Sequence, residues 1–146
     1  MAFSKSLPGE AEWASEPLCL DGESAHRNFF GKDLDAAFAL FVDNAMHYQE
    51  DLMFMPAVCF RYYVRAYSAY LLSQQSESDS DGASCYLGLI DFRHDELAEA
   101  SDEVRNEIVR VLDRLATEQA WYDADDGIYG SFPKKAQRCR EKLARD

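Results

Sequence analysis

Apolar residues recur at helical spacing in two long segments of this chain of 146 residues. The first segment begins near Asp33, an acid that the positive end of a helix dipole favours. The second begins at Ser101, which has the side chain of an N-cap and is followed by two acids. Spacings of three and four residues predict that each helix has one buried face. The apolar positions are Leu34, Ala37, Phe38, Phe41, Val42 and Ala45 in the first helix, and Val104, Ile108, Val111, Leu112 and Leu115 in the second.

The most apolar segment of the chain runs from Pro56 to Ser73 and contains only two charges, Arg61 and Arg65. Proline suits the first turn of a helix, because its missing N–H removes no hydrogen bond there. A helix that is apolar around most of its circumference is usually central in a fold. We therefore expect the other elements to pack around this helix.

Shorter patterns add further helices. A helical turn or two is expected to end at Gly31, and Ser131 introduces a last helix. Residues 83–92 are nearly all apolar, a pattern that fits a buried strand or a buried helix, and their acidic entrance favours a helix. Residues 46–55 lose the helical period and residues 123–130 contain two glycines, so both are expected to be loops.

These elements predict an all-α fold: a single-domain, compact bundle of five to six helices that cross orthogonally instead of running regularly up and down. We place this helical domain at residues 21–146. Residues 1–20 are interrupted by Pro8 and Pro17, and we expect them to form an irregular arm that docks through Trp13.

The composition narrows the class of protein. Apolar residues make up 47% of the chain and aromatic residues 13%, which is enough for a folded core. The net charge of −12 disfavours binding to nucleic acid or to an anionic membrane surface. The chain lacks an apolar run of about 18 residues, so we expect no membrane span, and its first residues lack the apolar centre of a secretory signal. Four scattered cysteines fit a reducing compartment, so we expect a cytoplasmic protein.

The charge is unevenly distributed along the chain. The last thirteen residues, from Lys134 to Asp146, contain six bases and two acids and carry +4, so the preceding residues carry −16. We expect the basic C-terminal helix to pack against the acidic body. The alternative is that the acidic body is a surface for a basic partner.

Two kinds of pattern could bind a metal. The acidic segment that begins at Glu77, ESDSDG, resembles the start of an EF-hand loop, but the twelfth position is Gly88 instead of an acid. A di-iron bundle uses Glu-x-x-His pairs, and the chain has one at residues 23–26 and a near match at residues 91–94. Such pairs arise easily by chance in a chain this rich in acids. We therefore expect no metal site and no cofactor.

Signatures of catalysis are missing from the sequence. The chain has no GxSxG nucleophile motif and no glycine-rich phosphate loop of the GxGxxG or Walker type. The three histidines are widely separated in sequence. We therefore expect no enzymatic activity and no catalytic residue.

Arg61 and Arg65 lie one turn apart on the most apolar helix, with Tyr62 between them. A buried charge without a partner is very costly, so each guanidinium should meet a carboxylate or reach solvent. Internal ion pairs are the interpretation that we favour in a chain with this excess of acids. The functional alternative is that Arg61, Tyr62 and Arg65 line a cleft that binds an anion.

Residues 60–72 read FRYYVRAYSAYLL after a Pro-containing turn, and residues 29–32 read FFGK. These motifs resemble a small, functionally uncharacterised bacterial family of acidic helical proteins with an aromatic helix of the type FRYYLPAY. The resemblance covers about residues 19–95. Residues 64–65 are Val-Arg where the family pattern has Leu-Pro, so this helix should lack a kink. The shared motifs are structural, so the resemblance implies a helical fold without assigning an activity or a site.

These observations favour a non-enzymatic, cytoplasmic interaction protein whose acidic surface docks a basic protein, for example an immunity-type inhibitor of a basic toxin. The alternative is a helical enzyme that binds a metal or an anion through the histidines or through Arg61, Arg65 and Tyr62. A third class is a homo-oligomeric scaffold with the apolar residues 53–55 at its contact. For the oligomeric state, we expect either a monomer or a homodimer.

Overall fold

The computed structural model describes residues 7–145, and within that range every regular element is helical. This confirms the all-α prediction. The α-helices are α1 (Glu10–Trp13), α2 (Leu20–Phe29), α3 (Leu34–Phe54), α4 (Ala57–Leu72), α5 (Ser80–Arg93), α6 (Asp102–Thr117), α7 (Asp126–Tyr129) and α8 (Phe132–Arg145), and the 3₁₀ helices are η1 (Gln74–Ser76) and η2 (His94–Glu99). None of these helices is long and apolar enough to cross a membrane.

The expected count of five to six helices is too low, because the described residues form eight α-helices. The two extra ones are the single-turn helices α1 and α7, which form in segments that we expected to be irregular. Each is held mainly by a few local hydrogen bonds at its ends, and a single turn has no apolar period for a sequence pattern to reveal. The orthogonal crossing of the helices stays a prediction.

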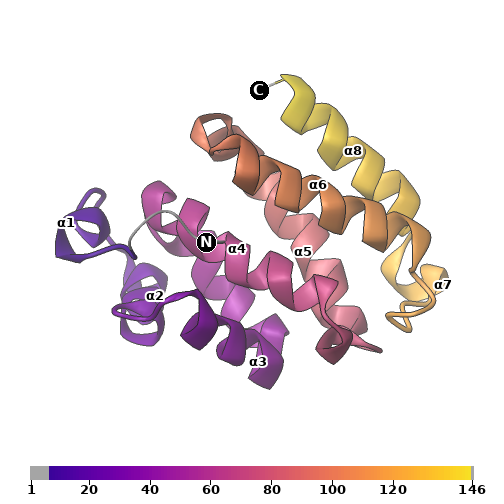
Figure 1. The fold of residues 1–146 in the computed structure, drawn as a ribbon, viewed down its shortest axis with the longest axis horizontal. Helices are drawn as coiled ribbons and strands as arrows, with labels where there is room; N and C mark the ends of the chain where they lie inside the picture. Colours follow the sequence, from indigo (N-terminus) through magenta and orange to yellow (C-terminus); the bar gives the residue numbers. More distant parts are fainter. Residues whose placement is uncertain (1–6, 146) are drawn as a thin grey trace.

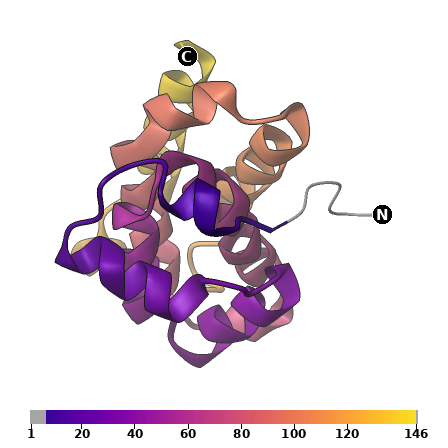
Figure 2. The same cartoon turned by 90° about the vertical axis from the view of Figure 1, so that its left-hand side faces the viewer.

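Helix α4 lies at the centre of the fold, as its apolar sequence predicts. It packs against α3 on one side and against α6 on the other, and α5 and α8 complete the half of the molecule that contains α6 (Figures 1 and 2). Ten of its sixteen residues are buried. The position of α4 therefore determines where its few polar side chains reach the surface.

The tyrosines of α4 have structural partners. The Tyr63 hydroxyl donates to the carbonyl oxygens of Phe29 and Lys32, at 2.9 and 2.8 Å, where α2 ends. The Tyr67 hydroxyl donates to the carbonyl of Gly82 at 2.5 Å, at the start of α5. Buried main-chain carbonyls need hydrogen bonds, so these phenols join α4 to the ends of its neighbours.

Helix α3 continues through residues 46–55 as far as Phe54, so the loop predicted there is wrong. Asn44, with φ −164° and ψ 84°, interrupts the helical backbone, and its side-chain oxygen accepts the N–H of His47 at 3.2 Å. This is the geometry of an N-cap inside one long helix. The kink at Asn44 changes which side of the helix is buried. The regular spacing of apolar residues is therefore interrupted in the sequence, although the helix continues to Phe54.

The terminal parts of the described chain pack onto the body. Trp13 is only 2% exposed, so residue 13 anchors the N-terminal stretch as predicted. The basic helix α8 also packs as predicted, because Lys142 pairs with Asp91 at 2.5 Å and Arg140 pairs with Asp113. Part of the positive charge of the C-terminal helix is thus paired with acids of the same chain. Residues 1–6 of the expected arm lie outside the described residues.

Asp51 is a buried acid between α2 and α3, only 6% exposed. Asn28 donates a hydrogen bond to its Oδ2 at 2.8 Å, and Ser24 donates to its Oδ1 at 3.4 Å. Burial is the largest influence and raises the pKa of Asp51, while the two hydrogen bonds and the nearby His47 lower it. Because the folded-state pKa exceeds the unfolded value, stability from this group is greatest at low pH and is lost as the pH rises through the folded pKa.

The variant Asp51→Asn removes this titration. We expect it to gain stability relative to the parent as the pH rises from about 4 to about 7, because only the parent then ionises a buried group. Urea unfolding of both proteins across this pH range measures the difference. Asp43→Asn is the control, because Asp43 is an exposed acid on the same helix. A stability difference that does not change with pH would contradict the assignment.

Candidate functional site

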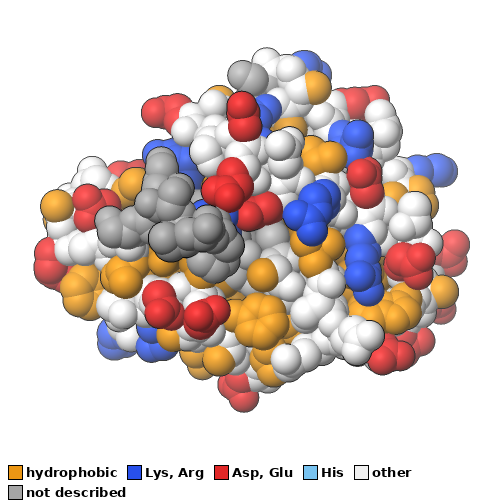
Figure 3. All heavy atoms as spheres, viewed as in Figure 1, with side chains coloured by type: hydrophobic (Ala, Val, Ile, Leu, Met, Phe, Trp, Pro, Cys, Tyr) orange, Lys and Arg blue, Asp and Glu red, His pale blue; other side chains and the backbone are white. Residues whose placement is uncertain are grey.

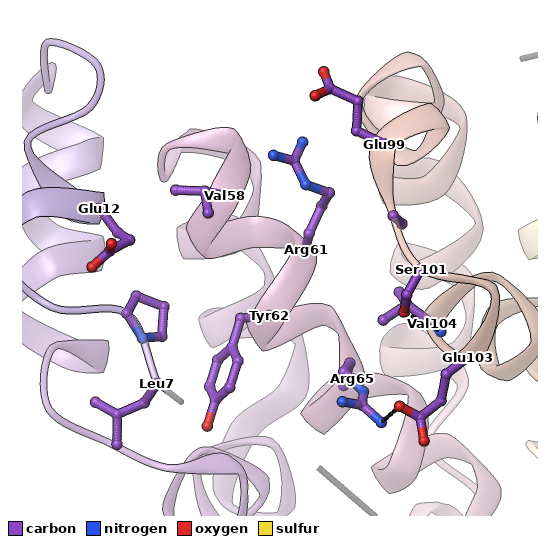
Figure 4. Close-up of a pocket in the computed structure, with 12 residues that line it drawn as sticks. Leu7, Glu12, Val58, Arg61, Tyr62, Arg65, Glu99, Ser101, Glu103 and Val104 are labelled. Carbon is purple, nitrogen blue, oxygen red and sulfur yellow. Dashed lines mark hydrogen bonds and ion pairs between the residues drawn. The ribbon is translucent and has the colours of Figure 1, made fainter. Parts of the chain in front are cut away.

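A cleft of about 620 Å³ lies between the N-terminal segment, α4 and the start of α6 (Figure 4). We refer to it as the α4–α6 cleft. Helix α4 forms its floor with Val58, Arg61, Tyr62 and Arg65. The sequence placed the last three on one candidate site, and the structure brings them together because Arg61 and Tyr62 lie four and three residues before Arg65, the spacings of neighbours on a helix surface.

Arg65 is a buried member of the cleft, with 4% of its side chain exposed. Its Nε and Nη2 donate to the two carboxylate oxygens of Glu107, at 3.0 and 2.8 Å, and Nη2 also lies 3.2 Å from Glu103. The hydrogen bond with Glu107 is the main cause that raises the pKa of Arg65, against the effect of burial. The internal ion pairing that we expected for Arg65 is therefore confirmed.

Arg61 is half-buried and extends between Val58 and Glu99 (Figure 4). Its Nη1 donates to the main-chain carbonyl of Glu96 at 3.0 Å. This bond holds the guanidinium against η2 and leaves a cationic group on the floor of the cleft. Arg61 thus reaches a carbonyl instead of a carboxylate, a partner that its sequence position could not indicate.

Three carboxylates line the same cleft: Glu12 from α1, Glu99 from η2 and Glu103 from α6. Glu99 and Glu103 are exposed. Glu12 accepts the N–H of Gly9 at 2.8 Å, which fixes its position. The residues that the sequence proposed for an anion therefore share their cleft with an excess of acids, a feature that depends on how α1 and η2 fold over α4.

Tyr62 presents a half-buried ring to the cleft, edge-on to Tyr63 with 4.8 Å between ring centroids. Burial, first, and the charge of Asp33, second, raise the pKa of Tyr62. The phenol therefore stays neutral at physiological pH. It offers an aromatic face beside carboxylates, which is a surface suited to a cation.

The histidines lie on separate elements. His26 on α2 lies 3.3 Å from Glu10 and stacks on Phe30, His47 lies on α3, and His94 begins η2. Over residues 7–145, no three His, Cys, Asp or Glu side chains are grouped so that they could hold a metal ion. Within these residues the histidines therefore belong to no such group.

The acidic segment that resembles an EF-hand has structural roles. Asp79 is the N-cap of α5, accepting the N–H of Gly82 at 3.0 Å and the hydroxyl of Tyr70 at 2.6 Å. Asp81 accepts the hydroxyl of Tyr129 at 2.8 Å. A Cβ at residue 82 would lie 2.2 Å from Asp79, so the cap requires glycine there. Capping explains this cluster without a metal.

The sequence analysis missed Arg93, the second arginine that is almost fully buried in the described chain. Its Nη1 donates to the carbonyls of Leu52 and Met55, at 2.8 and 2.7 Å, and its guanidinium lies 4.6 Å from the centroid of the Phe60 ring. It also pairs with Glu96. A lone arginine at the end of an apolar segment was the signal that could have identified it.

No family model, curated protein or solved structure matches this chain. The resemblance to a family with an aromatic FRYYLPAY-like helix therefore stays a prediction.

Proposed function

We propose that this protein is a non-enzymatic interaction protein that binds a basic protein partner through its acidic surface. The observation that carries the proposal is the charge of the exposed side chains. Among the described residues, twenty Asp and Glu side chains are exposed, against five Lys and Arg. The exposed bases are Arg27, Arg110, Lys134, Arg138 and Arg145.

Acids dominate the exposed side chains because most bases are held against the fold by contacts within this chain. Eight of the other described bases bind side chains or main-chain carbonyls of this chain: Arg61, Arg65, Arg93, Arg105, Arg114, Lys135, Arg140 and Lys142. Acids are spread widely over the face in Figure 3, including both of its ends. Such a surface attracts a basic chain over long range and repels acidic ones.

An immunity-type inhibitor that neutralises a basic enzyme is one concrete form of this function, acting in the cytoplasm as a monomer or homodimer. Charge complementarity accelerates association and excludes wrong partners, which is what such an inhibitor requires. The second candidate is an anion-binding pocket, which the meeting of Arg61, Tyr62 and Arg65 in one cleft favours. Glu12, Glu99 and Glu103 in that cleft weigh against it.

Capture of the tagged protein's partners from its own cell tests the function. We expect one or more strongly basic chains, bound at low salt and released steeply as the ionic strength rises, because exposed charges are screened by salt. Mass spectrometry of the eluted chains identifies them. Binding that persists unchanged at high salt would remove the electrostatic basis of the proposal.

A further inference from the structure

We infer that the α4–α6 cleft receives a lysine or arginine side chain of a basic polypeptide, held between the ring of Tyr62 and the carboxylates of Glu99 and Glu103. This inference rests on the proposed function and names the place and the chemistry of the contact. The occupant is a segment of the basic partner. Three features of the cleft support it: its charge, its apolar wall and its shape.

The charge of the cleft favours a cation. Of its two guanidinium groups, that of Arg65 is bound by both oxygens of Glu107, which lies outside the cleft lining. Glu103 also contacts Arg65, at 3.2 Å, and Arg61 donates to a main-chain carbonyl. Together with Glu107, the lining thus holds four carboxylates and two guanidinium groups. An incoming ammonium or guanidinium therefore meets a net negative site, whereas an anion has to approach three carboxylates.

The apolar wall suits the stem of a long basic side chain. Leu7 and Val58 line the cleft with 38% and 36% of their surface exposed, and Tyr62 adds its half-buried ring. Lysine and arginine bury their methylene groups against such surface while the charged end stays polar. An aromatic ring within reach of the cation adds a further attraction.

The shape of the cleft provides a concave site with donors and acceptors from three parts of the chain. Figure 4 shows Glu12 on one side, Arg61 and Tyr62 on the floor, and Glu99 and Glu103 on the opposite side. A volume of about 620 Å³ accommodates several side chains of a peptide. A concave site of this size can surround the charged end of a side chain.

Binding of a fluorescently labelled deca-lysine peptide, and of deca-arginine, tests the inference by fluorescence anisotropy at low salt. The test variant is Glu99→Gln combined with Glu103→Gln. The control is Glu118→Gln combined with Glu77→Gln, which removes the same charge from exposed acids that do not line the cleft. Tyr62→Phe and Tyr62→Ala test the ring, and circular dichroism melting establishes that each variant is folded.

We expect the cleft variant to weaken peptide binding about tenfold and the control variant less than about twofold. Tyr62→Phe should bind like the parent, and Tyr62→Ala should bind more weakly. Equal losses in the cleft and control variants would overturn the cleft as the site while leaving the acidic docking surface intact. Failure of the parent to bind either peptide at low salt would overturn both proposals.

Discussion

Replacing Arg93 with alanine is expected to lower the free energy of unfolding by about 4 kcal/mol. The buried guanidinium donates to the carbonyls of Leu52 and Met55, at 2.8 and 2.7 Å, and pairs with Glu96. The last carbonyls of a helix have no partner within it, and Arg93 supplies one for the end of α3. Its removal leaves buried acceptors without a donor. Urea unfolding of parent and variant measures the loss.

Arg110→Ala is the control for this experiment, because Arg110 is exposed on α6. We expect it to change stability by less than about 0.5 kcal/mol. A third variant, Arg93→Lys, keeps the charge but loses the planar group that reaches both carbonyls and Glu96, so it should recover only part of the loss. If Arg93→Ala costs no more than Arg110→Ala, the guanidinium does not hold the end of α3.

The sequence predicts well those elements whose stability is local and periodic. Helix α6 begins after Ser101, whose side chain accepts the N–H of Val104, and five positions at strict helical spacing form its buried face. Likewise Asp33 caps α3 by accepting the N–H of Ala36 at 2.9 Å. Caps and spacing depend on neighbours in the sequence, so they can be read before the fold is known.

Two features that the sequence did not predict were missed for different reasons. Asn44 caps the second half of α3 from inside the helix. The buried side of the helix changes at this residue, so the apolar spacing is interrupted and the sequence pattern predicts a loop. The partners of Arg93 are carbonyls, and every residue has a carbonyl, so no side-chain pattern identifies them. The first error concerns a local cap inside a helix, and the second concerns main-chain atoms 41 and 38 residues away in the sequence.

The candidate site also has one part that the sequence predicts and one part that it does not. Arg61 and Tyr62 are both helical neighbours of Arg65, and their spacing was enough to group the three residues. The opposing carboxylates of Glu99 and Glu103 reach the cleft only because η2 and the start of α6 fold over α4. The sequence therefore located the floor of the cleft but left the sign of its charge undetermined, and the walls change the expected ligand from an anion to a cation.

Replacing Arg65 with alanine is expected to cost about 3 kcal/mol of stability. The variant leaves Glu107, whose side chain is only 22% exposed, without the guanidinium that binds both of its oxygens. Glu103 is 48% exposed, so its contact with Arg65 contributes less than about 1 kcal/mol. Urea unfolding of Arg65→Ala, Glu107→Ala and the double variant gives the coupling between the two residues, which we expect to reach about 2 kcal/mol.

The same variant separates a structural Arg65 from an anion ligand. If Arg65 acts only through Glu107, inorganic phosphate should shift the melting temperature of the parent and of Arg65→Ala equally, while the coupling to Glu107 stays large. A coupling near zero, together with a phosphate-dependent stabilisation that Arg65→Ala abolishes, would instead make Arg65 an anion-binding residue. Glu103→Ala is the matched control, because it removes the more exposed of the two carboxylates bound to the same guanidinium and should destabilise the fold much less. The buried pair thus accounts for one of the two arginines on the central helix, and Arg61 is the cation that remains to balance the acids of the cleft.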